Sequence, residues 1–256
     1  MTARAGMAQW SEYEQTREVS DMTAGRPTGG HLKSGKKRTL SSRRWLERQL
    51  NDPYVAEAKR RGLRSRAAFK LMELDDRFAL LRPGARVVDL GAAPGGWTQI
   101  SAERVRAGKP GGGTVVGIDV LDMAPIFGAV LIRADILDPE SPKRLMAALG
   151  GQADVVLSDL APPASGHAGA DHLRIVGLVE EAVSFAYAVL APAGMFVAKV
   201  WQGGTEAHLL AEMKRRFRSV RHAKPPASRP ESAEVYVVAM GFRGAPSDET
   251  FIAEDL

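Results

Sequence analysis

The chain has 256 residues and a formal net charge of +5, with 45% hydrophobic and 25% charged residues. These values exclude a mainly disordered or fibrous chain, and the length suits one α/β domain with an appended terminal segment. The absence of cysteine excludes disulfides and thiolate metal sites, and it suits the cytoplasm.

The N-terminal part of the chain is basic. Residues 1–40 hold scattered Gly, Ser and Thr and a Lys33–Arg38 cluster, and we expect a mobile basic arm. Residues 41–256 are expected to form the folded domain, beginning with helices over 41–80. Their positive charge favours a phosphate-contacting surface over a merely solvated helix face. The candidate RNA contacts are Arg43, Arg44, Lys59, Arg60, Arg61, Arg64 and Arg66.

Apolar runs alternate with helical stretches over 84–243, which predicts a mostly parallel sheet covered by helices on both faces. The last two strands are joined by a loop too short for a crossover helix, so we expect them to be antiparallel. Ala182–Ala198 is uncharged over nearly a membrane-spanning length, but Pro192 and Gly194 divide it. A helix ending near Leu190 and then a strand are expected there. The strands are predicted near 86–90, 114–119, 129–133, 153–158, 194–200, 218–222 and 234–242.

A glycine-rich turn follows the first predicted strand. The segment Asp89-Leu-Gly-Ala-Ala-Pro-Gly-Gly-Trp97 leads into a helix near Gly96. Glycines let the backbone approach a ligand closely, and free N–H groups at a helix start favour ligand oxygens. A dinucleotide-binding turn needs glycine where this chain has Ala93 followed by Pro94, so pyrophosphate binding is disfavoured.

Two carboxylates follow the next strands. Asp119 ends the second strand, where a carboxylate suits the two hydroxyls of a ribose. Asp135 lies just past the third strand and is as well explained as a turn residue, because Asp138 and Pro139 follow it.

Four charged residues lie at the ends of ordered, otherwise apolar segments or inside them: Lys70, Asp159, Lys199 and Glu234. Charges are rarely placed against core segments without a partner or a function. Each alone is explained as a charge at a strand end or on a helix. Together with the glycine-rich turn they indicate one catalytic site.

Several motifs occur in an order that resembles the FtsJ/RrmJ-type ribose 2′-O-methyltransferases. They are Ser41–Leu50, Gly62–Leu71, Val87–Trp97, Ser158–Gly166, Val197–Gly203 and Ser232–Tyr236, and the resemblance covers about residues 41–243. It implies a Rossmann-like S-adenosylmethionine-dependent fold whose mostly parallel seven-stranded sheet has one antiparallel strand. The implied cofactor residues are Asp89, Gly91, Pro94, Gly95, Gly96, Trp97, Asp119, Asp135 and Asp159.

The resemblance also implies the reaction, which is methylation of a uridine 2′-hydroxyl in the A-loop of 23S rRNA in the large ribosomal subunit. The enzyme must align the hydroxyl with the donor and remove its proton, and no metal is required. A lysine accepts that proton only when a second ammonium and loss of water favour its neutral form. Lys199 is therefore the expected base, with Lys70 beside it, Asp159 orienting it, and Glu234 holding Lys70 or the ribose.

Three functions stay open on the sequence. They are rRNA methylation, the same reaction on tRNA or an mRNA cap, and a non-catalytic RNA-binding role in ribosome assembly. Methylation at pyrimidine carbon 5 is excluded because it ordinarily begins with a cysteine thiolate. His167, Asp171 and His172 could suggest a metal site. No third side chain among or near them has a clear metal-ligand spacing, so no metal site is expected. We also expect a monomer.

Overall fold

The computed structural model describes residues 50–161, 168–201 and 207–244, without the side chains of 168–173. Residues 57–244 belong to one compact unit that holds the whole sheet. The predicted arm lies outside the described residues, so the boundary near residue 41 stays a prediction.

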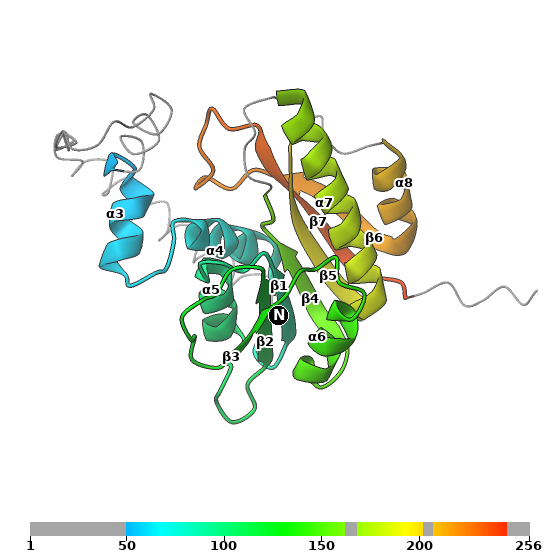
Figure 1. The fold of residues 1–256 in the computed structure, drawn as a ribbon, viewed down its shortest axis with the longest axis horizontal. Coiled ribbons are helices and arrows are strands. Elements are labelled where there is room, and N and C mark those ends of the chain that lie inside the picture. Colours follow the sequence, from blue (N-terminus) through cyan, green and yellow to red (C-terminus); the bar gives the residue numbers. More distant parts are fainter. Residues whose placement is uncertain (1–49, 162–167, 202–206, 245–256) are drawn as a thin grey trace, which may run out of the picture. The chain divides into compact units, whose positions relative to one another are not determined.

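Helices and strands alternate along the described chain, as Figure 1 shows. The helices are α3 (Pro53–Arg60), α4 (Ala67–Phe78), α5 (Gly96–Arg104), α6 (Ser141–Leu149), α7 (Ala168–Val189) and α8 (Ala207–Arg216). The strands are β1 (Arg86–Leu90), β2 (Thr114–Asp119), β3 (Ala129–Arg133), β4 (Ala153–Ser158), β5 (Leu190–Trp201), β6 (Phe217–Ala223) and β7 (Glu234–Phe242).

The seven strands form one sheet in the order β3-β2-β1-β4-β5-β7-β6. Strands β1 to β5 pair in parallel, whereas β7 runs antiparallel to both β5 and β6. The predicted fold class is therefore confirmed, including the single antiparallel strand. Strand order reverses between β1 and β4, and open sheets of this kind bind ligands at that point, beyond the carboxyl ends of the strands.

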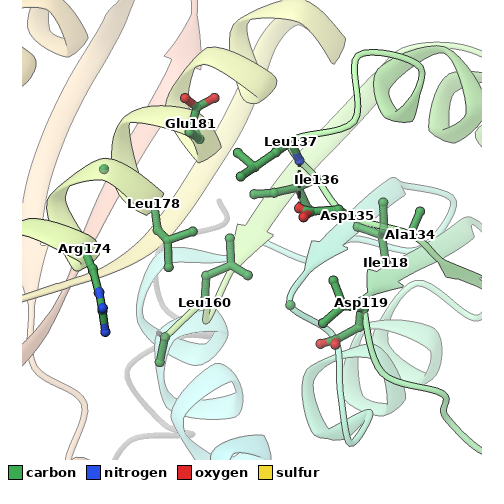
Figure 2. A pocket seen from close by; sticks show the side chains of 14 residues that line it. Ile118, Asp119, Ala134, Asp135, Ile136, Leu137, Leu160, Arg174, Leu178 and Glu181 are labelled. Atoms are coloured by element: carbon green, nitrogen blue, oxygen red, sulfur yellow. Dashed lines mark hydrogen bonds between the residues drawn. The ribbon is translucent and has the colours of Figure 1, made fainter. Parts of the chain in front are cut away.

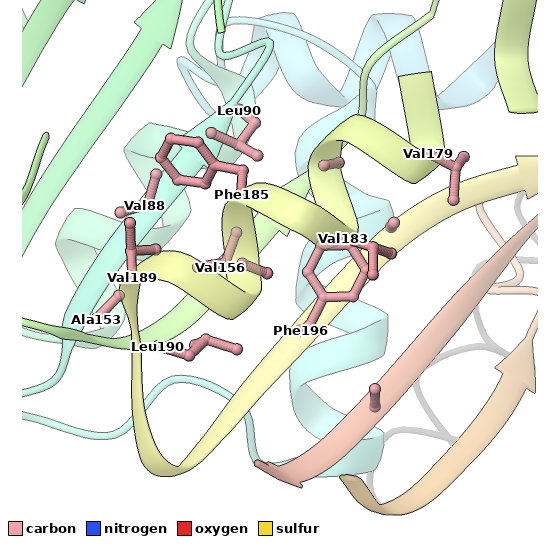
Figure 3. Packing of buried hydrophobic residues seen from close by; sticks show 14 of the residues in the cluster. Val88, Leu90, Ala153, Val156, Val179, Val183, Phe185, Val189, Leu190 and Phe196 are labelled. Carbon is pink, nitrogen blue, oxygen red and sulfur yellow. The ribbon is translucent and has the colours of Figure 1, made fainter. Parts of the chain in front are cut away.

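Alternating side chains of the strands supply two cores, one on each face of the sheet. Helices α6, α7 and α8 pack over one face, and Figure 3 shows α7 residues Phe185 and Val189 against Val88 and Val156. Helices α4 and α5 pack over the other face. The nearly continuous burial along β1 and β4 follows from this double coverage, because both faces of these central parallel strands are covered by helices.

Strand β5 begins four residues earlier than predicted. Leu190 already pairs with Ala153, and the register then shifts before Val155 pairs with Met195. Pro192 and Gly194 therefore lie in an irregularity of the ladder, and the sequence suggested a loop because such residues usually end strands. Among the described residues, no helix is long and apolar enough to cross a bilayer.

Candidate active site

A cavity of about 560 Å³ opens at the switch point of the sheet. Figure 2 shows the ends of β2 and β3 on one side of it, α7 on the other, and Leu160 between them. The lining residues are Gly91, Ile118, Asp119, Val120, Ala134, Asp135, Ile136, Leu137, Leu160, Ala161, Arg174, Gly177, Leu178 and Glu181. Three of the predicted cofactor residues thus line it: Gly91, Asp119 and Asp135.

The two carboxylates of the cavity differ in how they are held. Asp119 accepts a hydrogen bond from the Ala93 backbone N–H at 2.9 Å and from the Leu121 N–H at 2.8 Å. Each of its oxygens keeps a second lone pair for a ligand hydroxyl. Asp135 accepts from the Leu137 N–H at 3.0 Å, so it shapes a turn and also lines the cavity. Asp135 is thus a turn residue that also lines the cavity, and its contact with a cofactor stays a prediction.

The cavity suits a nucleoside. Ile118, Leu160 and Leu178 provide apolar walls for a flat ring, and carboxylates at the strand ends can accept from hydroxyl or amine groups. We did not predict from the sequence that α7 lines this cavity, because the spacing of its apolar residues indicated only a helix packed in the core. Arg174, Leu178 and Glu181 follow one another at helical spacing, which places them along one side of α7.

The four charged residues come together as two ion pairs. The Lys199 ammonium donates to the Asp159 backbone carbonyl at 2.8 Å and lies 3.1 Å from its carboxylate Oδ1. The Lys70 ammonium bonds the Glu234 carboxylate Oε1. Both lysines are less than a tenth exposed. Four residues from α4, from the end of β4, and from β5 and β7 thus form one buried polar cluster.

Tyr236 joins the two pairs, and sequence reasoning did not assign it a function. Its hydroxyl lies 2.8 Å from Asp159 Oδ1 and 3.2 Å from Glu234 Oε1. A phenol has one proton, so it donates to one carboxylate at a time, and the shorter distance favours Asp159. The signal in the sequence was the i, i+2 spacing of Glu234 and Tyr236, which puts both side chains on one face of a strand.

The electrostatics of the cluster follow from burial and from these contacts. Burial acts to raise the pKa of Glu234, but the Lys70 ammonium, with help from Lys199 and the Ser228 hydroxyl, lowers it below its ordinary value. Burial raises the pKa of Tyr236 well above 10, and the neighbouring carboxylates of Asp159 and Glu234 raise it further. At neutral pH Glu234 is therefore ionised and Tyr236 keeps its proton.

Two predicted cofactor contacts are corrected by the structure. Asp89 is fully buried and accepts from the Thr98 hydroxyl at 2.6 Å, so its side chain supports the start of α5 instead of facing the cavity. Trp97 is 3% exposed, donates its indole N–H to the Ala67 carbonyl at 2.8 Å, and packs against the Tyr236 ring with a centroid separation of 5.5 Å. Neither side chain lines the cavity, and both pack under the glycine loop, which we define as residues 91–97.

The remaining predicted cofactor residues are Pro94, Gly95, Gly96 and Asp159. None of them lines the cavity, although Asp159 directly precedes Leu160.

The predicted RNA-contacting residues divide into three groups. Arg43 and Arg44 lie outside the described residues. Lys59, Arg60 and Arg61 lie at the exposed end of α3 and just beyond it, where both arginines pair with Glu57 and lower its pKa to about 2.

The last two, Arg64 and Arg66, are partly exposed and hydrogen-bond backbone carbonyls. Arg66 donates to the Ala227 carbonyl at 2.6 Å, and Arg64 donates to the carbonyls of Ala124 and Pro125. A guanidinium held in this way supports the scaffold, and an RNA contact by either residue stays a prediction.

The histidines considered as metal ligands lie where the structure describes no side chains, since His167 is outside the described residues and His172 has an undescribed side chain. Among the side chains that are described, no three His, Asp or Glu residues are grouped so that they could hold a metal ion.

Comparison with known proteins gives the family. The family model of FtsJ-like methyltransferases matches residues 63–242. A protein of Paramagnetospirillum magneticum named ribosomal RNA large subunit methyltransferase E is 61% identical over 230 residues, covering 87% of this chain and 94% of the relative. A protein of the same name in Rhodospirillum rubrum is 55% identical over 244 residues, with 93% of each chain covered.

A solved structure supports the same family. It is described as a ribosomal RNA methyltransferase of Plasmodium falciparum and aligns with a TM-score of 0.62 at 30% identity. The alignment covers 71% of this chain and all of the other. The chain therefore belongs to the FtsJ-like methyltransferase family.

Proposed function

We propose that this protein methylates a ribose 2′-hydroxyl of large-subunit ribosomal RNA, at a uridine of the A-loop, with S-adenosylmethionine as the donor. The observation that carries the proposal is the buried Lys199 ammonium, which is held by Asp159, the residue directly before Leu160 of the cavity lining. The names of the relatives support the RNA, and the resemblance of the motifs supports the 2′-hydroxyl and the uridine.

The lining of the cavity supports this donor. Asp119 would accept hydrogen bonds from the ribose hydroxyls and Asp135 from the adenine amine, while Ile118 and Leu160 would contact the ring. When bound, S-adenosylmethionine supplies a methyl group activated by a positively charged sulfur. Because this donor already carries a good leaving group, the protein has to contribute alignment and proton removal.

Lys199 is the proposed base. A neutral amine has two N–H bonds and one lone pair. Asp159 offers two acceptors, its carbonyl and its Oδ1, and these fix the two N–H bonds and leave the lone pair for the hydroxyl proton. With donor bound, Lys199 Nζ would take the proton of the 2′-oxygen as that oxygen bonds the methyl carbon and the carbon–sulfur bond breaks, which releases S-adenosylhomocysteine. Lys70, held by Glu234, is the second ammonium of the same cluster.

The exposed basic residues Lys59, Arg60 and Arg61, together with Arg43 and Arg44 outside the described part, are proposed to contact RNA phosphates. Their positive charge would supply affinity for RNA, whereas the cluster of Lys70, Asp159, Lys199 and Glu234 would carry out the methyl transfer.

The test is methyl transfer from labelled S-adenosylmethionine to large ribosomal subunits that lack the modification, followed by nucleoside analysis of the product. We expect 2′-O-methyluridine from the wild type and none from Lys199→Ala or Lys199→Arg, since a guanidinium does not deprotonate near neutral pH. Calorimetry should show that both variants still bind S-adenosylhomocysteine. Transfer by Lys199→Ala at the wild-type rate would rule out Lys199 as the base.

A further inference from the structure

Arg64 ties together the two loops that border the donor cavity. Its guanidinium donates to the Pro94 carbonyl of the glycine loop at 3.4 Å. It also donates to the carbonyls of Ala124 at 2.7 Å and Pro125 at 2.5 Å. The latter two belong to the β2–β3 loop, residues 120–128. Three backbone acceptors from two loops thus share one planar side chain, for which the fixed fork of arginine is suited.

The backbone around Arg64 is fixed as well. The Arg64 N–H donates to Gln99 Oε1 at 3.0 Å, and Gln99 Nε2 donates to the Gly62 carbonyl at 3.0 Å. Gln99 lies in the first turn of α5, directly after the glycine loop. The segment before α4 is therefore held against the loop at both its main chain and its side chain.

Gly95 shows how closely these parts approach. Its φ of +105° is one that side chains rarely adopt, and a Cβ there would lie 2.9 Å from Arg64 Cδ and 2.8 Å from Ile126 Cδ1. The glycine loop, Arg64 and the β2–β3 loop are thus packed without space for a side chain between them. A movement of Arg64 would be transmitted to both loops.

On the cavity side, Asp119 makes the second link between the same loops. It ends β2 and accepts from Ala93 of the glycine loop and from Leu121 of the β2–β3 loop. Asp119 and Arg64 thus connect the loops at two separate points, one inside the cavity and one outside it. The outer link fixes the separation of the loops and hence the position of the Asp119 carboxylate relative to Gly91, which also lines the cavity.

We infer that Arg64 is a positioning residue for the donor site, which it holds at the width that S-adenosylmethionine requires. The inference rests on the proposed function for the identity of the donor. It replaces the RNA contact that the sequence predicted for Arg64, and it separates this residue from Arg60, which is exposed and pairs with Glu57.

The test uses Arg64→Met, which keeps the aliphatic stem and removes the five donors, and Arg64→Lys, which keeps the charge but cannot reach both loops with one ammonium. Calorimetry should show S-adenosylhomocysteine binding weakened about tenfold or more in both variants, the scale of losing hydrogen bonds from a charged donor. RNA affinity and its salt dependence should stay at the wild-type values. Arg60→Met should instead keep the wild-type affinity for S-adenosylhomocysteine and weaken RNA binding.

Arg66→Met is the matched control, since Arg66 also donates to a loop carbonyl, that of Ala227, which does not border the cavity. Wild-type donor affinity in Arg64→Met overturns the inference, whatever happens to RNA binding. An equal loss of donor affinity in Arg66→Met would also overturn it, because general destabilisation would then explain both. If Arg64→Met does not fold, Arg64→Lys decides by the same criteria. A wild-type chain that binds no S-adenosylhomocysteine would instead refute the proposed function.

Discussion

The buried carboxyl of Asp89 makes folding stability depend on pH. Its pKa is raised from 3.8 to about 7, chiefly by loss of hydration; the charges of Asp159 and Asp119 act in the same direction, and the hydrogen bonds from Thr98 oppose them. Between these two pKa values the folded chain holds a proton that the unfolded chain has released. Stability should therefore fall as pH rises through this window.

The size of this effect follows from the two pKa values. A difference of about three pKa units corresponds to about 4 kcal/mol over the whole window, of which about 3 kcal/mol falls between pH 5 and pH 8. Asp89→Asn removes the titrating group and keeps an oxygen that can accept from Thr98. Its stability relative to the wild type should thus rise by about 3 kcal/mol from pH 5 to pH 8.

Urea unfolding of the ligand-free protein, followed by tryptophan fluorescence at pH 5, 6, 7 and 8, measures this difference. Asp122→Asn is the control, because Asp122 is exposed and pairs with Arg133 on the surface. It should leave the pH dependence unchanged. If wild type and Asp89→Asn show parallel pH profiles, Asp89 does not hold a proton in the folded state and the reasoning is refuted.

Three further predictions concern function. Asp119→Ala should weaken S-adenosylmethionine binding by about 1–3 kcal/mol, which calorimetry measures, and unchanged affinity would remove this carboxylate from the donor site. Replacing both Arg60 and Arg61 with Gln should flatten the log–log salt dependence of RNA binding by about one to two units, and an unchanged slope would place the RNA surface elsewhere. Tyr236→Phe should slow transfer about tenfold at saturating donor because the link between Asp159 and Glu234 is lost, and a wild-type rate would contradict that role.

The fold was predictable because its signals are local. Strands β1 to β4 begin and end at the predicted residues. For β1, β2 and β4 the reason is burial on both faces, which favours a largely apolar sequence. The approach of Asp159 and Lys199 was also accessible, because the carboxyl ends of the parallel strands β4 and β5 meet at one edge of the sheet. Glu234 reaches the same edge because it begins the antiparallel strand β7, and Lys70 joins it from α4.

The directions of individual side chains were not accessible in the same way. Arg64 and Arg66 lie at and just before the start of α4, where no helical period shows which way a side chain points. Their carbonyl partners come from loops 30 to 161 residues away in the sequence. Asp89 has the same difficulty, because an acidic residue at a strand end can face a ligand or the buried side of the next helix. Its burial depends on the packing of Thr98.

We propose that this chain places a 2′-O-methyl group on large-subunit rRNA and that Lys199 is the base. The most direct measurement maps 2′-O-methyl nucleotides across that RNA from cells with the chain, without it, and with Lys199→Ala in its place. We predict one A-loop uridine that is modified only with the wild-type chain. An identical map in all three, or full modification with Lys199→Ala, would contradict the account.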